Sequence, residues 1–262
     1  MKGLNKLTSD KRMLEYGIMQ SYSNISCFST TRHGGCSKGT YATFNCTHYC
    51  GDEWKNVRLN RERILEYLPD GVNTLVIPEQ THSTNVKVLL ETPAVEELKD
   101  VDAIVTQLSG HCLCVSTADC VPVMLFDVKK RVIAAIHAGW RGTVGRIVEK
   151  TLKVMNAQYG TEGRDVIACI GPSISMESFE VGDEVYDAFQ IAGFDMQCIA
   201  RKYEKWHIDL WEANRVQLLA CGVLQENIEV SGVCTYQRCE DFFSARRLGI
   251  RSGRILSGIM LH

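Results

Sequence analysis

The chain has 262 residues and a formal net charge of −2, with 45% hydrophobic and 23% charged residues. These are the proportions of an ordinary globular protein, and the lack of a basic block argues against a dedicated nucleic-acid-binding protein. No apolar run reaches membrane-spanning length, and the first twenty residues contain no apolar signal-peptide core. We therefore expect a cytoplasmic protein that binds neither nucleic acid nor membrane and keeps its twelve cysteines reduced.

Apolar periodicity predicts strands and helices along the whole chain, and no repeat or Pro/Ser-rich linker divides residues 1–262. We expect one domain with an α/β or α+β fold, in which helices pack outside mixed β-sheets. In chain order, the predicted elements are a helix over 53–68, strands over 74–78, 85–90, 102–106, 111–117, 121–126 and 131–136, a helix over 143–158, a strand over 165–172, helices over 182–193 and 209–219, and strands over 228–234 and 253–261.

The stretch 111–145 carries the strongest chemical signal. Its two apolar strands, 121–126 and 131–136, are joined by residues 127–130, which suit a hairpin turn. A hairpin centred there places Cys120 directly opposite His137, and such cross-strand partners have Cβ atoms about 4.5–5.5 Å apart. A thiolate and an imidazole at that separation can share one metal ion. The alternative interpretation is a free core cysteine beside a hydrogen-bonded histidine.

A Gly-rich segment follows His137 and leads into the helix predicted at Thr143. Backbone N–H groups at such a helix start bind anions, so the sequence predicts a phosphate site beside the metal site. An ordinary strand-to-helix turn is the alternative. Asp119, directly before Cys120, suits either a base that orients a ligand or a cap of the turn before the strand.

Two further stretches contain polar residues suited to binding. Arg32 and Asn45 flank a loop rich in Gly, Ser and Thr, which fits either the rim of a site or plain surface. Arg246 and Arg247 belong to a C-terminal arginine cluster, which favours a solvated face or a contact with phosphate or carboxylate. Common nucleotide-binding, hydrolase and zinc-deaminase signatures are absent from the sequence.

Eight motifs between residue 30 and the C-terminus coincide with those of one known family. They are TTRHGGCS (30–37), PEQTH (78–82), DAIVT (102–106), STADCVPVMLFD (116–127), HAGWRGT (137–143), IGPSI (170–174), FEVGDEV (179–185) and FFSARRLGIRSGR (242–254). Together they resemble the family known both as multicopper polyphenol oxidase (laccase)-like and as purine nucleoside phosphorylase. The most specific element is ADC followed seventeen residues later by HAGWRG.

The resemblance implies α/β/β/α layers, a fold related to cysteine hydrolases, and a zinc site formed by His82, Cys120 and His137. Three protein ligands leave a fourth position open, as in catalytic zinc sites. It also implies phosphorolysis of adenosine, inosine and methylthioadenosine, with phosphate as co-substrate, and deamination of adenosine. The expected catalytic residues are Cys120, His137, Asp119 and Arg141, and the expected substrate contacts are Arg32, Asn45, Thr143, Arg246 and Arg247.

One segment departs from the family pattern, because relatives often carry a cysteine shortly after the Gly-Pro where this chain has Ser178. That departure argues against a metal or thiol role for residues 175–178.

Three other functions compete with the phosphorylase. A copper phenol oxidase would explain the older family name, but the seven histidines are never closer than fifteen residues in sequence. Copper is the alternative metal for a thiolate–imidazole site. A cysteine hydrolase would use Cys120 as nucleophile and His137 as base. A metal-stabilised binding protein would have no catalytic activity.

Overall fold

The computed structural model describes residues 6–69, 72 and 74–262. The first of its two larger sheets has the order β1 (Lys6–Leu7), β2 (Met13–Glu15), β3 (Ile25–Thr30), β15 (Ile255–Leu261), β7 (His111–Thr117) and β4 (Thr74–Val76). The second has the order β14 (Ile228–Val230), β10 (Val166–Ile170), β8 (Val121–Asp127), β9 (Val132–Ala138), β6 (Ala103–Thr106) and β5 (Val86–Leu89). Both sheets are mixed, because parallel pairs such as β4–β7 and β5–β6 adjoin antiparallel ones.

A small third sheet, missed by the sequence analysis, contains β11 (Glu180–Val181), β13 (Trp206–Ile208) and β12 (Ala200–Lys202). Its strands are too short to give an alternating pattern. The α-helices are α1 (Trp54–Tyr67), α2 (Trp140–Val144), α3 (Ile147–Tyr159), α4 (Asp183–Ile191), α5 (Met196–Ile199), α6 (Leu210–Ala220) and α7 (Ala245–Leu248). Single 3-10 turns cover Gly39–Tyr41, Val95–Leu98, Gly163–Asp165, Met176–Ser178 and Gln225–Asn227. No helix in the described ranges is long and apolar enough to cross a membrane.

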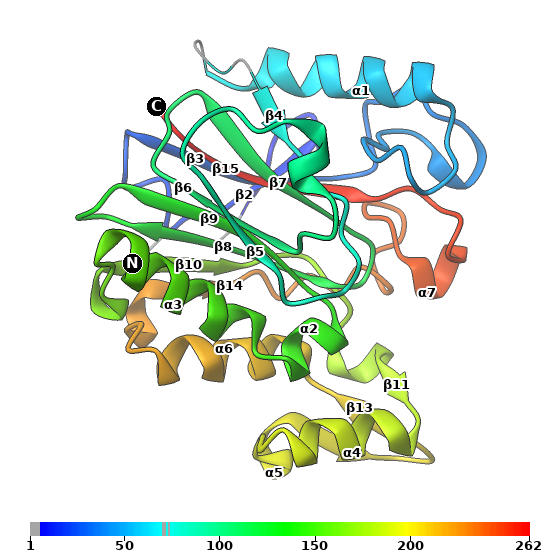
Figure 1. Cartoon of the computed structure of the whole chain (residues 1–262). Helices are drawn as coiled ribbons and strands as arrows, with labels where there is room; N and C mark the ends of the chain where they lie inside the picture. The colour runs from blue at the N-terminus through cyan, green and yellow to red at the C-terminus, as the bar shows by residue number, and fades with distance from the viewer. Residues whose placement is uncertain (1–5, 70–71, 73) are drawn as a thin grey trace.

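The two larger sheets stack face to face between helical layers, with α1 outside the first sheet and α3 and α6 outside the second (Figure 1). Alternation along β8 explains the arrangement. Met124 and Phe126 face the core between the sheets, while Val123 and Leu125 face the helices. Both faces of the strand are therefore buried, which is why its sequence is continuously apolar. The mixed α/β class and the α/β/β/α layers are confirmed; the relation to cysteine hydrolases stays a prediction.

The predicted elements are present with two notable differences. The helix predicted over 143–158 is two helices, α2 and α3, separated at Arg146, whose φ is +62°. The first of these two helices therefore begins at Trp140, earlier than predicted. The second difference is the register of the β8–β9 hairpin, which bears directly on the site and is described there.

Helix α1 is tied to the loop before it through one buried polar side chain. Asn60 is fully buried, and its amide nitrogen donates to the Asn45 carbonyl (2.8 Å), the Ser37 hydroxyl (3.0 Å) and the Thr43 carbonyl (3.2 Å). Its oxygen accepts from the Cys36 N–H at 3.0 Å. Because buried polar groups are costly when unpaired, Asn60 holds this loop in place.

Replacing Asn60 by Leu should lower the free energy of unfolding by about 2–3 kcal/mol, because it leaves several buried backbone groups unpaired. Urea denaturation measures the change. The control is Asn156→Leu, which removes one hydrogen bond, to the Thr161 carbonyl, from an exposed helix position. That control should cost less than about 1 kcal/mol. Equal losses in the two variants would contradict the role given to Asn60.

Candidate active site

Three side chains from separate parts of the chain converge at one end of the layer between the sheets. His137 lies near the end of β9, Cys120 lies in the turn before β8, and His82 lies in the loop between β4 and β5. One ligand atom from each lies within 4.8 Å of the other two. His137 is buried, Cys120 is partly exposed and His82 is exposed, so the cluster is reached from solvent on the His82 side. These are the three residues that the resemblance implies as metal ligands.

The hairpin register differs from the prediction by two residues. Pro122, not Cys120, lies opposite His137, and the turn spans residues 128–131. Asp127 is the reason, because its side chain accepts from the Lys129 and Lys130 N–H groups (both 2.9 Å) and caps the turn as the last strand residue. Cys120 is therefore not directly cross-strand from His137. A two-residue shift keeps side chains on the same face, which is why the two still converge.

The donor atoms fit a zinc ion. The Cys120 Sγ lies 3.7 Å from the His82 Nε2. Sulfur and nitrogen ligands at zinc bond lengths of about 2.3 and 2.05 Å, in tetrahedral geometry, lie about 3.6 Å apart. His137 uses its Nδ1 to contact the Asp102 carboxylate at 2.7 Å, so its Nε2 is left for the metal. A thiolate and two imidazoles are ligands that zinc prefers.

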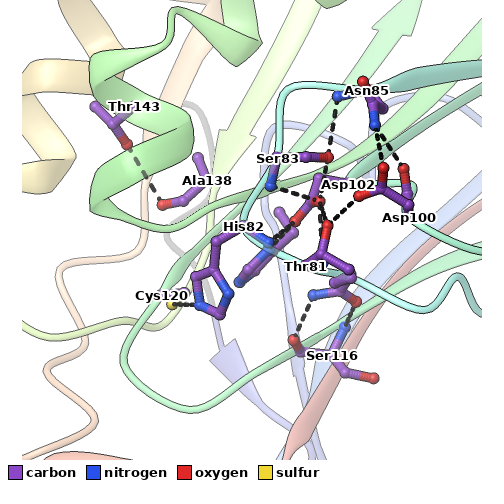
Figure 2. A network of polar contacts seen from close by, with 12 residues as sticks. Thr81, His82, Ser83, Asn85, Asp100, Asp102, Ser116, Cys120, Ala138 and Thr143 are labelled. Atoms are coloured by element: carbon purple, nitrogen blue, oxygen red, sulfur yellow. Dashed lines mark hydrogen bonds and ion pairs between the residues drawn. The ribbon is translucent and has the colours of Figure 1, made fainter.

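Asp102 joins the ligands into one unit, and the sequence analysis missed it (Figure 2). One carboxylate oxygen accepts from the His137 ring (2.7 Å) and the His82 N–H (3.1 Å). The other accepts from the N–H groups of Thr81 (3.1 Å) and Ser83 (2.9 Å) and from the Ser83 hydroxyl (2.7 Å). Asp102 is fully buried, and only its place at the start of the DAIVT motif could have drawn attention to it.

Charge is balanced among Asp102, His137 and Cys120. Burial works to raise the pKa of Asp102, but the hydrogen bond and charge of His137, with the Ser83 and Thr81 donors, lower it to about 2. Burial works to lower the pKa of His137, but the Cys120 thiolate and Asp102 raise it to about 9. Burial likewise opposes ionisation of Cys120, yet His137 and His82 lower its pKa to about 6. The thiolate that a metal requires is thus favoured near neutral pH.

Gly139 lets the three ligands approach one another closely. A Cβ atom at this position would lie 2.8 Å from the His82 ring carbon Cδ2 and 3.2 Å from the Cys120 Sγ. Both His82 and Cys120 would have to move to make room. The glycine of the HAGW motif is therefore required by the packing of the site, in addition to any role in the turn.

Comparison with known proteins identifies the family. The family model for multi-copper polyphenol oxidoreductase laccase matches residues 26–262. A purine nucleoside phosphorylase of Bacteroides thetaiotaomicron is 57% identical over 98% of each chain. The chain belongs to this family.

Other family members extend the comparison in sequence and in structure. A protein named adenosine deaminase RL5, from an unknown prokaryotic organism, is 43% identical over 92% of this chain and 95% of its own. The crystal structure of the hypothetical protein YfiH of Bacillus licheniformis has a TM-score of 0.90 at 26% identity, covering 98% and 99% of the two chains. That of YlmD from Geobacillus stearothermophilus has a TM-score of 0.89 at 29% identity, covering 99% of both. The family fold is thus shared along essentially the whole chain.

Asp119 directly precedes Cys120, and Arg141 follows His137 by four residues, but their side chains do different things. Arg141 is exposed and its guanidinium lies over the Trp140 ring, 4.4 Å from the centroid, with no hydrogen bond or ion pair to the described residues. Asp119 accepts from the Thr235 hydroxyl and the Arg246 N–H, both at 2.7 Å. Asp119 thus fastens the start of α7 to the turn that carries Cys120, and its catalytic role stays a prediction.

Arg32 and Asn45 form hydrogen bonds that hold the loop between them in place. Arg32 donates to the Ala42 carbonyl (2.8 Å) and the Cys239 carbonyl (2.6 Å), and burial lowers the pKa of its guanidinium. Asn45 is fully buried; its amide group donates to the Thr47 carbonyl and to Asp52, both at 2.9 Å. Direct contact of either residue with a substrate stays a prediction.

Thr143 does not begin a helix, which corrects the sequence prediction. Helix α2 begins at Trp140, and the Thr143 N–H already donates to the Gly139 carbonyl at 2.8 Å. Its buried hydroxyl accepts from Asn214 at 3.1 Å. The prediction erred because Trp140, Arg141 and Gly142 are not typical of a first helical turn. The N–H of Thr143 is therefore not free to bind an anion.

The two C-terminal arginines of the prediction lie in α7 (Figure 1). The Arg246 guanidinium donates to the Glu180 carbonyl at 3.1 Å and lies 5.5 Å from the centroid of the Phe179 ring. Arg247 lies over the Tyr236 ring at 5.0 Å. Both side chains are exposed. The backbone N–H of Arg246 donates to Asp119, which directly precedes Cys120.

Replacing Asp102 by Asn should weaken zinc binding by about 10–100-fold, because the amide cannot accept from both His137 and the 81–83 loop. Competition with a chromophoric chelator measures the affinity. Asp165→Asn is the control, since the Asp165 carboxylate pairs with Lys129 at 2.9 Å and touches neither a ligand histidine nor the 81–83 loop. An unchanged affinity in the Asp102 variant would refute its role in orienting the ligands.

Replacing Gly139 by Ala should weaken zinc binding at least tenfold, because the new methyl group displaces His82 from the Cys120 sulfur. The matched control is Gly142→Ala in α2, the helix that follows Gly139, where a Cβ would meet its nearest atoms at 3.4–3.5 Å, an ordinary contact. Zinc titration of both variants, with melting curves of the metal-free proteins, checks the prediction. Equal affinities in the two variants would show that Gly139 is a feature of the turn only.

Proposed function

We propose that this protein is a zinc-dependent purine nucleoside phosphorylase that also deaminates adenosine. The observation that carries the proposal is the His–Cys–His cluster, three protein ligands that are accessible from solvent through His82. Relatives named purine nucleoside phosphorylase and adenosine deaminase support the same substrate class. Adenosine, inosine and methylthioadenosine are the proposed nucleosides, and phosphate is the proposed co-substrate.

In this proposal His82, Cys120 and His137 hold the zinc ion, and Asp102 fixes the two histidines. Bound zinc would act as a Lewis acid and lower the pKa of water that it binds. Arg141, in the first turn of α2, has a guanidinium with no hydrogen-bond or ion-pair partner in the described structure and is the proposed donor to phosphate. Asp119 keeps α7 against the turn that carries Cys120. The chain's own residues therefore bind and orient, while the metal supplies electrophilic chemistry.

A cysteine hydrolase is the second candidate, because the pKa of Cys120 is lowered to about 6 beside the imidazole of His137. That pair matches the nucleophile and base of thiol enzymes. A metal on both groups would block such chemistry, so removal of metal separates the two functions. The chelated protein loses activity if it is a zinc enzyme and gains it if it is a thiol hydrolase.

The multicopper oxidase function implied by the family's older name has less support. In the described part of the chain, the only group of three or more potential His, Cys or carboxylate ligands is His82, Cys120 and His137. A multicopper oxidase needs several copper ions in reach of one another, whereas one cluster holds one metal ion. Copper instead of zinc at this cluster remains an alternative that metal analysis decides.

Zinc-loaded protein should convert adenosine and phosphate to equal amounts of adenine and ribose 1-phosphate, at a rate that rises with phosphate concentration. Deamination to inosine should persist without phosphate, since water is its co-substrate. Chromatography of the products measures both reactions, and an oxygen electrode tests for phenol oxidation. Cys120→Ala should abolish both reactions because it removes a metal ligand. Failure to release base from any proposed nucleoside at millimolar phosphate would overturn the proposal.

A further inference from the structure

A polar pocket at α7 has no role in the proposal so far. It has a volume of about 310 Å³ and is lined by Glu177, Ser178, Glu180, His207, Tyr236 and Arg246. We call it the α7 pocket, because Arg246 in α7 forms one wall while the 3-10 turn Met176–Ser178 and strands β11 and β13 form others.

The α7 pocket is joined to the metal cluster through Asp119. The carboxylate of Asp119, next to Cys120 in sequence, accepts from the Arg246 N–H and from the hydroxyl of Thr235, each at 2.7 Å. Arg246 lines the pocket, and Thr235 directly precedes Tyr236, which lines it too. Asp119 therefore connects the turn that carries Cys120 to two walls of the pocket.

His207 presents a hydrogen-bond acceptor to this pocket. Its Nδ1 lies 2.8 Å from the Met176 carbonyl, which accepts a hydrogen bond and thereby fixes the proton on Nδ1. The ring stands edge-on to Tyr203, at a centroid distance of 5.0 Å. No described residue forms a hydrogen bond with its Nε2, which remains an acceptor in the neutral ring.

The other lining groups also favour a neutral ligand rich in hydroxyl groups. Hydrogen bonds lower the pKa of Glu177, and Lys205 lowers that of Glu180, so both carboxylates are ionised at neutral pH. Lys205 pairs with Glu180 at 2.7 Å, Arg246 lines the same pocket and Arg201 acts on Glu177, so positive and negative groups offset one another, which suits a polar ligand without charge. Carboxylates accept hydrogen bonds from sugar hydroxyls, as they do for the ribose of dinucleotides.

We propose that the α7 pocket binds the sugar of the purine nucleoside, with His207 and Glu177 accepting hydrogen bonds from its hydroxyl groups while the base faces the metal cluster. This inference rests on the proposed function and assigns the orientation of its substrate. Phosphate would attack C1′ of the bound sugar on the face opposite the base, so that the C1′–O bond forms as the C1′–N bond to the base breaks. His207 and Glu177 become residues that select ribonucleosides by their hydroxyl pattern.

The test compares adenosine with its 2′-, 3′- and 5′-deoxy analogues in the wild-type protein, His207→Ala and Glu177→Gln. Each variant should raise the KM for adenosine about tenfold with kcat within about twofold, because a hydrogen bond to bound substrate is lost. For each variant, there should be one deoxy analogue whose kcat/KM in the wild-type protein is about tenfold below that of adenosine. In the variant, the same analogue and adenosine should have equal kcat/KM, because the hydrogen bond is already lost. His111→Ala is the matched control. His111 begins β7, whereas the other end of that strand contacts the site, because the Ser116 carbonyl accepts a hydrogen bond from Gln80 in the loop that carries His82.

Unchanged KM values and unchanged discrimination among the deoxy analogues would overturn the sugar pocket while leaving the phosphorylase intact. So would a change in the KM for phosphate instead of that for adenosine, which would make this a phosphate site. If the wild-type protein turns over no nucleoside, the proposed function fails, and calorimetric titration with adenosine decides the pocket. Binding that His207→Ala weakens would uphold the pocket, and absent or unweakened binding would overturn it.

Discussion

The site depends on one buried carboxylate. Asp102 receives hydrogen bonds from the ring of His137, from the backbone of His82 and from both neighbours of His82, so it fixes a ligand in the second sheet and a ligand in a loop that follows the first. A carboxylate without these donors would be too costly to bury. The same contacts leave Nε2 of His137 for a metal and determine where the loop carrying His82 can lie. Carboxylate–histidine pairs of this kind orient metal ligands and raise their basicity.

The layered fold explains why such a site exists at this place. His137 continues the face of β9 that carries Ile133 and Ala135 toward the first sheet, and the apolar core between the sheets ends there. Polar side chains replace apolar ones at this end of the layer, where water reaches His82 and Cys120. The core on either side is large, so we expect the fold to form without the metal and packing to hold the ligands before any ion binds. The close approach of backbone at Gly139 belongs to the same preorganisation.

The chemistry of the surroundings is divided between two sides of the cluster. Arg141 in α2 offers a guanidinium with no hydrogen-bond or ion-pair partner in the described chain, whereas the α7 pocket presents two carboxylates and the acceptor nitrogen of His207. Asp119 links the two sides, because it adjoins Cys120 and holds α7 by the Arg246 N–H. The contacts of Asp119 hold α7 in place, and any effect of Asp119 on catalysis would act through the position of α7.

The sequence by itself determined the fold class, most element positions and the His82, Cys120 and His137 set, because buried strands leave continuous apolar runs and the motifs are specific. It also placed Cys120 and His137 on one face of the sheet. Side chains alternate between the two faces of a strand, so a shift of the register by two residues leaves them on the same face. Tertiary structure alone decided the true register, through the turn hydrogen bonds of Asp127, and the start of α2 at Trp140. It alone disclosed Asp102 and His207, whose partners are 35 and 31 residues away in sequence. Contacts between distant segments leave no periodic signal in the chain, and therefore had to be seen in three dimensions.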